Sequence, residues 1–179
     1  MYKRQPEVIA RLKELGISKV VMMTGDSERT AKAIAGRVGV DEYYSEVLPE
    51  DKASFVEKEK KAGRKVIMIG DGINDSPALS AADVGIAISD GAQIAREIAD
   101  ITVSAEDLGQ IAFIKDLSNN LIKKINRNYR TIVSFNSGLI ALGVLGIIPP
   151  TTSALLHNTS TLLISMNSMK DIPVEVEIN

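Results

Sequence analysis

The residues best suited to chemistry lie in the run 70–79, which reads GDGINDSPAL. Four apolar residues, 66–69, precede this run and are typical of a buried parallel strand. The run therefore occupies the turn at the carboxyl end of a strand, where open α/β sheets bind their ligands. Asp71 and Asp75 offer the hard oxygen donors that Mg²⁺ prefers, and the glycines let the backbone approach a ligand closely. This pattern predicts a magnesium site, whereas an isolated Gly-Asp-Gly would indicate only a turn.

A second polar turn follows the strand predicted at residues 19–23. Thr24 supplies a hydroxyl and Gly25 a backbone N–H, and the helix predicted at 27–38 would direct its positive N-terminus to the same place. These groups together suit an anion. Asp26 or Ser27 is also expected to cap that helix with its side chain.

Three motifs, at residues 24–27, 48–52 and 70–79, resemble in type and order those of the P-type ATPases. The phosphorylation domain of that family has a haloacid-dehalogenase-like fold, and the resemblance covers nearly the whole chain. It implies that Lys52, which alone would be taken for a solvated charge, binds phosphate together with Thr24 and Gly25.

The same resemblance implies roles for the remaining polar residues of these motifs. Asp71 would bind Mg²⁺ with Asp75 supporting it, directly or through water. Asn74 would hydrogen-bond the transferring phosphoryl group, and Asp26 would shape its loop. A site of this kind transfers a phosphoryl group from ATP by positioning and charge neutralisation.

The nucleophile of such a pump is missing from the chain. P-type ATPases form an aspartyl-phosphate on an Asp-Lys-Thr-Gly-Thr motif, which does not occur here. The chain is therefore expected to be the C-terminal part of a pump, without ATP turnover of its own. Two other functions remain open: a membrane-anchored phosphatase of the same fold, which the missing nucleophile disfavours, and a non-catalytic membrane binding module.

The region from Thr131 to Met169 contains no Asp, Glu, Lys or Arg. Pro149-Pro150 divides it into two segments, each close to the roughly 20 residues that cross a bilayer. Basic residues lie before the first segment and after the second, at Lys115, Lys123, Lys124, Arg127, Arg130 and Lys170. By the positive-inside rule both ends are cytoplasmic. The pattern predicts a transmembrane hairpin in contact with membrane lipid, and hence a multi-pass protein of the cell membrane with a cytoplasmic phosphorylation domain.

Only one pair of membrane helices is predicted after the motif at 70–79. In this respect the chain resembles the heavy-metal-transporting branch of the family. Polar groups at membrane depth are costly and therefore indicate function. His157, Asn158 and Thr161 are predicted ligands of a transported transition-metal cation. His157 and Thr161 match a His-Glu-Gly-x-Thr pattern of cobalt-type pumps and Asn158 departs from it, so the metal stays open. His157 and Asn136 could instead hold the two helices together by hydrogen bonds.

Composition and element order limit the remaining possibilities. A net charge of -2 argues against nucleic acid as a partner, and the absence of cysteine excludes disulfides and thiolate metal sites within the chain. Alternating strands and helices predict an α/β fold with a doubly wound parallel sheet, incomplete in this chain. The predicted organisation is part of the phosphorylation domain at 1–106, a connecting helix at 107–130, and the hairpin with a cytoplasmic tail at 131–179.

Overall fold

The computed structural model describes residues 5–88, 93–104 and 107–174, and the chain divides into two compact units that meet between Phe113 and Ile114. The alternation of elements predicts a helix at 92–99, whose first residue lies outside the described residues, as do the last five residues, 175–179, of the predicted cytoplasmic tail.

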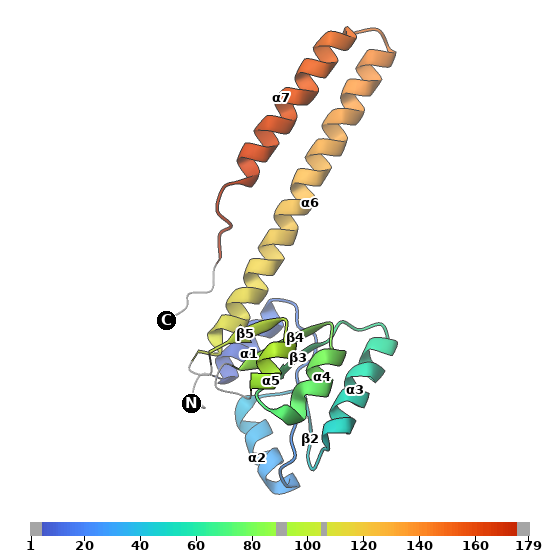
Figure 1. Cartoon of the computed structure of the whole chain (residues 1–179). Coiled ribbons are helices and arrows are strands. Elements are labelled where there is room, and N and C mark those ends of the chain that lie inside the picture. Colours follow the sequence, from blue (N-terminus) through green and yellow to red (C-terminus); the bar gives the residue numbers. More distant parts are fainter. Residues whose placement is uncertain (1–4, 89–92, 105–106, 175–179) are drawn as a thin grey trace. The chain divides into compact units, whose positions relative to one another are not determined.

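The first unit alternates helices and strands, as the sequence pattern predicted (Figure 1). Its elements are α1 (Gln5–Glu14), β1 (Val21–Met23), α2 (Glu28–Val38), β2 (Glu42–Tyr44), α3 (Pro49–Lys61), β3 (Ile67–Gly70), the 3-10 helix η2 (Ile73–Asp75), α4 (Ser76–Ala81), β4 (Val84–Ile88), α5 (Gln93–Ile98) and β5 (Ile101–Val103). The strands predicted at 19–23 and 66–69 are present as β1 and β3, with bounds that differ from the expected ones by at most two residues.

Every strand pair is parallel, which confirms the predicted class of α/β fold. The described strands form two sheets, however, with the orders β1-β2 and β3-β4-β5, where a single sheet was expected. β1 and β3 each have one edge without a partner strand in the described part of the chain. Among the described residues, no strand pairs with both β1 and β3 and so joins the two sheets.

The prediction that β3 is buried throughout is only partly right. Met68 packs with Val56 of α3 and Leu79 of α4 in the core, but Ile67 and Ile69 are each 41% exposed. Successive side chains of a strand point to opposite faces. Helices α3 and α4 of this chain cover one face of β3, and its other face remains open.

Three aspartates, each immediately before a strand, fix the start of the neighbouring strand. Each carboxylate accepts a hydrogen bond from a backbone N–H, in the pairs Asp41 with Val20 at 2.7 Å, Asp83 with Val66 at 3.0 Å, and Asp100 with Gly85 at 2.8 Å. Because register determines which side chains face the core, these bonds help to place the strands relative to one another.

The second unit contains the rest of α6 (Gly109–Val144) and all of α7 (Pro150–Ser168), which lie side by side and antiparallel in Figure 1. Polar residues spaced four or eight apart on α6 contact the returning segment. The contacts are Asn120 with the Pro173 carbonyl at 3.0 Å, Lys124 with the Lys170 carbonyl, Asn128 with the Ser168 hydroxyl at 2.7 Å, and Asn136 with His157 at 2.9 Å. Helices α6 and α7 thus form an antiparallel pair with a break before Pro150.

The membrane spans predicted within this hairpin are not confirmed. In the described part of the chain, no helix combines the length and the apolar character that crossing a bilayer requires.

Candidate functional site

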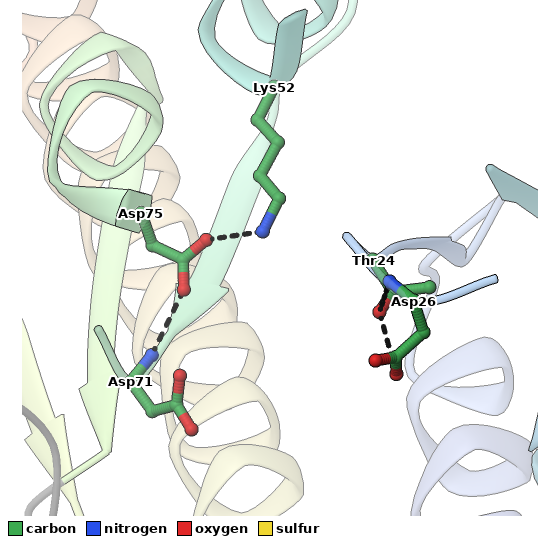
Figure 2. Close-up of polar contacts among 5 residues, drawn as sticks. All are labelled: Thr24, Asp26, Lys52, Asp71 and Asp75. Atoms are coloured by element: carbon green, nitrogen blue, oxygen red, sulfur yellow. Dashed lines mark hydrogen bonds and ion pairs between the residues drawn. The ribbon is translucent and has the colours of Figure 1, made fainter. Parts of the chain in front are cut away.

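The centre of the site is a largely buried ion pair between Lys52 and Asp75 (Figure 2). Lys52 lies in the first turn of α3 and Asp75 ends η2, and their Nζ and Oδ1 atoms are 2.8 Å apart. The side chains are only 13% and 10% exposed. The other carboxylate oxygen of Asp75 accepts a hydrogen bond from the Asp71 backbone N–H at 3.4 Å. Asp75 therefore joins the end of β3 to the start of α3.

Gly70, the last residue of β3, is required by this arrangement. A Cβ atom at position 70 would lie 2.5 Å from the Cβ of Asp75 and 2.9 Å from its Cγ and Oδ2. Such distances are far inside van der Waals contact, so any side chain would displace the carboxylate. The sequence suggested that the glycines admit a ligand, but at Gly70 the group that approaches closely is Asp75. The sequence offered one signal for this close approach: Gly70 ends the strand directly before Asp71.

Asp71 and Asn74 differ from Asp75 because both are exposed. The Asp71 carboxylate makes no hydrogen bond or ion pair with any described residue, and Figure 2 shows both of its oxygens unengaged. An exposed carboxylate with uncommitted oxygens suits a hard cation such as Mg²⁺. Over the ranges that the structure describes, no group of three or more His, Cys, Asp or Glu residues is arranged to hold a metal.

Thr24 and Asp26 form a second polar group at the end of β1 (Figure 2). The Thr24 hydroxyl donates to Asp26 Oδ2 at 3.1 Å and accepts from the Asp26 backbone N–H at 3.1 Å. Within the described residues, no hydrogen bond joins this group to the Lys52–Asp75 pair. The structure thus brings Lys52, Asp75 and Asp71 together in one group and holds Thr24 and Asp26 in another, while Gly25 is exposed beside them.

The expected capping of α2 by Asp26 or Ser27 is wrong. Ser27 occupies the N-cap position, but neither side chain makes a capping hydrogen bond. The Asp26 carboxylate is engaged by the Thr24 hydroxyl, and the Ser27 hydroxyl lies 3.2 Å from that of Thr30. Each of these side chains thus bonds to a nearby hydroxyl instead of to a backbone N–H of the helix.

The loop after β2 supports the Thr24–Asp26 group and was not anticipated from the sequence. Glu46 donates its backbone N–H to the Asp26 carbonyl at 2.9 Å, in a left-handed conformation with φ of 54°. Glu28 accepts hydrogen bonds from the hydroxyls of Ser45 and Tyr43, both at 2.7 Å. These bonds, the one from Ser45 first, lower the pKa of Glu28, and the carboxylate in turn raises the pKa of Tyr43.

In the second unit, the imidazole of His157 contacts Asn136, which was not among the predicted metal ligands. The Nδ1 atom of His157 is 2.9 Å from Oδ1 of Asn136. The hydroxyl of Thr161 donates to the backbone carbonyl of His157 at 3.0 Å, and Asn158 is exposed. Asn136 and His157 both line an open cavity of about 720 Å³ between the helices, together with apolar residues that include Leu139.

Comparison with known proteins gives the family of the chain. Two family models of haloacid dehalogenase-like hydrolases match residues 1–83 and 53–114. The chain is 38% identical over 92% of its length to a manganese-exporting P-type ATPase from Mycobacterium leprae, of which it covers 23%. It is 42% identical over 92% of its length to a copper-exporting P-type ATPase from Bacillus subtilis, of which it covers 20%.

Solved structures give the same result. The crystal structure of a zinc-transporting PIB-type ATPase matches with a TM-score of 0.81 and 32% identity, over 93% of this chain and 27% of that one. A parallel α/β fold, a Lys–Asp pair at the end of its strands and these relatives together define the class. The chain belongs to the heavy-metal P-type ATPases and spans about a quarter of the length of the relatives it matches.

Proposed function

We propose that this chain is the C-terminal part of an ATP-driven pump that moves a transition-metal cation across a membrane through an aspartyl-phosphate intermediate. The observation that carries the proposal is the Lys52–Asp75–Asp71 arrangement at the carboxyl end of β3. It places a positive charge, a buried carboxylate and an exposed carboxylate where a phosphoryl group and Mg²⁺ could meet. Such a site stabilises phosphoryl transfer mainly by position and charge.

Each residue of this site has a proposed task. Lys52 uses one of its three N–H donors on Asp75 and keeps two for phosphoryl oxygens. Asp71 would hold Mg²⁺, which when bound neutralises charge on those oxygens. Asp75 supports both by fixing the Lys52 ammonium and the Asp71 backbone. Its carboxylate already accepts from these two donors, which favours an indirect role toward the metal.

Three further residues complete the proposed phosphoryl site. The exposed amide of Asn74 would donate to a phosphoryl oxygen. Thr24 and Gly25 would bind other oxygens from the end of β1, and Asp26 holds the Thr24 hydroxyl in place. ATP would be the phosphoryl donor in the complete pump.

The remainder of the pump polypeptide is the partner that this proposal requires. The motif that carries the phosphorylated aspartate is absent from the sequence. The unpaired edges of β1 and β3, and the open face at Ile67 and Ile69, support the proposal that a segment outside this chain completes the sheet. We therefore expect no ATP hydrolysis by the 179-residue chain alone. A membrane-anchored phosphatase of the same fold would need the missing nucleophile as well, whereas a non-catalytic binding module would need none.

We also propose that α6 and α7 form a transmembrane hairpin in the cell membrane, after a phosphorylation domain at 1–106 in the cytoplasm and a connecting helix at 107–130. Large apolar side chains are exposed along both helices, among them Ile140, Val144, Leu155 and Leu162. The match to the zinc-transporting ATPase covers 93% of the chain, so it extends into the hairpin. Reporter fusions after Arg130, near Pro150 and after Asn179 test this proposal, which fails if the fusion near Pro150 reports from the cytoplasm.

Within the hairpin we propose His157, Asn158 and Thr161 as ligands of the transported cation. The imidazole lies at the cavity between the helices, where a borderline divalent cation would find nitrogen and oxygen donors. The relatives export manganese or copper and the structural neighbour transports zinc, so the choice among these metals is left to experiment.

The central proposal is tested in the complete pump by Asp71→Asn. This variant keeps the shape of the side chain and removes its charge, so Mg²⁺-dependent phosphoenzyme formation should fall to background. Asp107→Asn, at an aspartate outside the site, is the matched control and should phosphorylate normally. Normal phosphoenzyme levels in Asp71→Asn, with normal membrane insertion, would overturn the assignment.

A further inference from the structure

The contact between Asn136 and His157 determines which nitrogen of the imidazole is free. Oδ1 of Asn136 is a carbonyl oxygen and has no proton to donate. With the Asn136 amide in this orientation, the proton in the 2.9 Å hydrogen bond belongs to Nδ1 of His157. A neutral imidazole carries one ring proton, so the lone pair remains on Nε2.

The position of this contact distinguishes it from the other polar contacts of the hairpin. The contacts made by Asn120, Lys124 and Asn128 all reach residues 168–173, at the open end of the hairpin. Asn136 and His157 lie closer to the turn, and both line the cavity. The same cavity is lined by small residues, Gly143, Ser153 and Ala154, which leave space beside the ring.

We propose that Asn136 is a positioning residue that holds His157 as its Nδ1–H tautomer and so presents Nε2 to a divalent cation at this cavity. The proposal rests on the proposed function, in which His157 binds the transported cation. Histidines that bind metals through one nitrogen commonly donate the other ring N–H to an oxygen, which fixes the tautomer and the ring orientation. Asn136 therefore acts through His157 and is not itself a ligand.

The first test needs no metal. His157 is the sole histidine of the chain, so isotopic labelling of histidine gives one imidazole spectrum for the full 179-residue chain in lipid or detergent. The ¹⁵N shifts should show Nδ1 protonated and Nε2 unprotonated. Asn136→Leu should reduce the Nδ1–H population, and Asn136→Asp, which keeps an oxygen at this position, should restore it. Asn128→Leu, which removes another contact between the same helices, should leave the spectrum unchanged.

Two results of this test would overturn the proposal. One is a wild-type spectrum in which Nε2 carries the proton. The other is an Asn136→Leu spectrum with an unaltered tautomer population, because the amide would then only hold the helices together.

The second test uses the complete pump and measures ATPase stimulation by Mn²⁺, Zn²⁺ and Cu⁺. Removing an outer partner of a metal-binding histidine typically weakens metal affinity about 10–100-fold. Asn136→Leu should raise the half-maximal concentration of the stimulating metal by such a factor with little change in the maximal rate, and Asn136→Asp should recover it. Equal half-maximal concentrations in Asn136→Leu and Asn128→Leu would refute the positioning role.

A different variant, His157→Ala, tests the proposed function separately from the positioning role of Asn136. If His157→Ala keeps wild-type stimulation by all three metals, His157 is not a cation ligand and the cation step of the inference is overturned with it. The tautomer measurement still reports, in that case, whether Asn136 sets the protonation of the ring.

Discussion

Replacing Lys52 by Met should destabilise the first unit strongly, because it leaves the Asp75 carboxylate buried without its cation. Removing one partner of a buried ion pair costs about 3–5 kcal/mol. Asp75 keeps the hydrogen bond from the Asp71 N–H and its side chain is 10% exposed, so some solvation remains. We therefore expect the lower end of the range, about 3 kcal/mol.

The chain offers a matched control on the same helix. Lys61 pairs with Glu57 at 3.4 Å, but these side chains are 80% and 60% exposed. Exposed pairs contribute about 0–1 kcal/mol, so Lys61→Met should change the free energy of unfolding by less than about 1 kcal/mol. The two variants make the same chemical change on α3 and differ in burial.

Urea unfolding of the full chain in mild detergent, followed by circular dichroism, measures both costs. For a slope of about 2 kcal/mol per M, a loss of about 3 kcal/mol lowers the midpoint by about 1.5 M. The double variant Lys52→Met with Asp75→Leu should recover much of the loss, since no charge is left buried. Equal midpoints for Lys52→Met and Lys61→Met would refute this reasoning.

Three other outcomes are expected. Gly70→Ala should lower the free energy of unfolding by about 1–3 kcal/mol through overpacking. Because the added Cβ displaces Asp75, the variant should also abolish phosphoenzyme formation in the complete pump. Phosphorylation at the wild-type level would contradict the geometry. The pKa values of Asp41 and Asp83 are lowered from 3.8, by Lys13 and the Val20 N–H for the first and by the Val66 N–H and Lys65 for the second. The stability that these carboxylates contribute is therefore present above pH 3.8 and is lost as the pH falls through their lower pKa values in the folded state. Acid should therefore lower the urea midpoints of Asp41→Asn and Asp83→Asn less than it lowers that of the wild type. Glu46→Gly should raise the free energy of unfolding by up to about 1 kcal/mol. The left-handed conformation costs a non-glycine residue about 1–2 kcal/mol, and glycine avoids this cost but loses more backbone entropy on folding. A loss of stability would show that Glu46 is not strained.

The element order and the polar residues of the first unit could be predicted because their signals are local. Apolar runs of strand length, helical periodicity and the motifs around Thr24 and Asp71 depend on residues close together in the sequence. The hairpin was predicted for the same reason, from a long interval without charge and the Pro149-Pro150 break. Whether this hairpin crosses a membrane is still a proposal.

The structure revealed partners and strand pairings that the residue types alone had not indicated. Asp75 was expected to support a metal, directly or through water, and the structure also pairs its carboxylate with Lys52, 23 residues upstream. Asp26 was expected to cap a helix, but the Thr24 hydroxyl engages its side chain instead. The strands were expected in one sheet, and their pairing in two sheets depends on which edges the chain can fill.

The sequence by itself determined the class of fold, the order of the elements and the family, because each rests on residue types at short spacing. Only the tertiary structure decided that Gly70 must be glycine, since the atom that excludes a side chain belongs to Asp75. It also selected Asn136 as the partner of His157, 21 residues away on a neighbouring helix. Helix packing sets such distances, and the identity of either residue alone does not encode them.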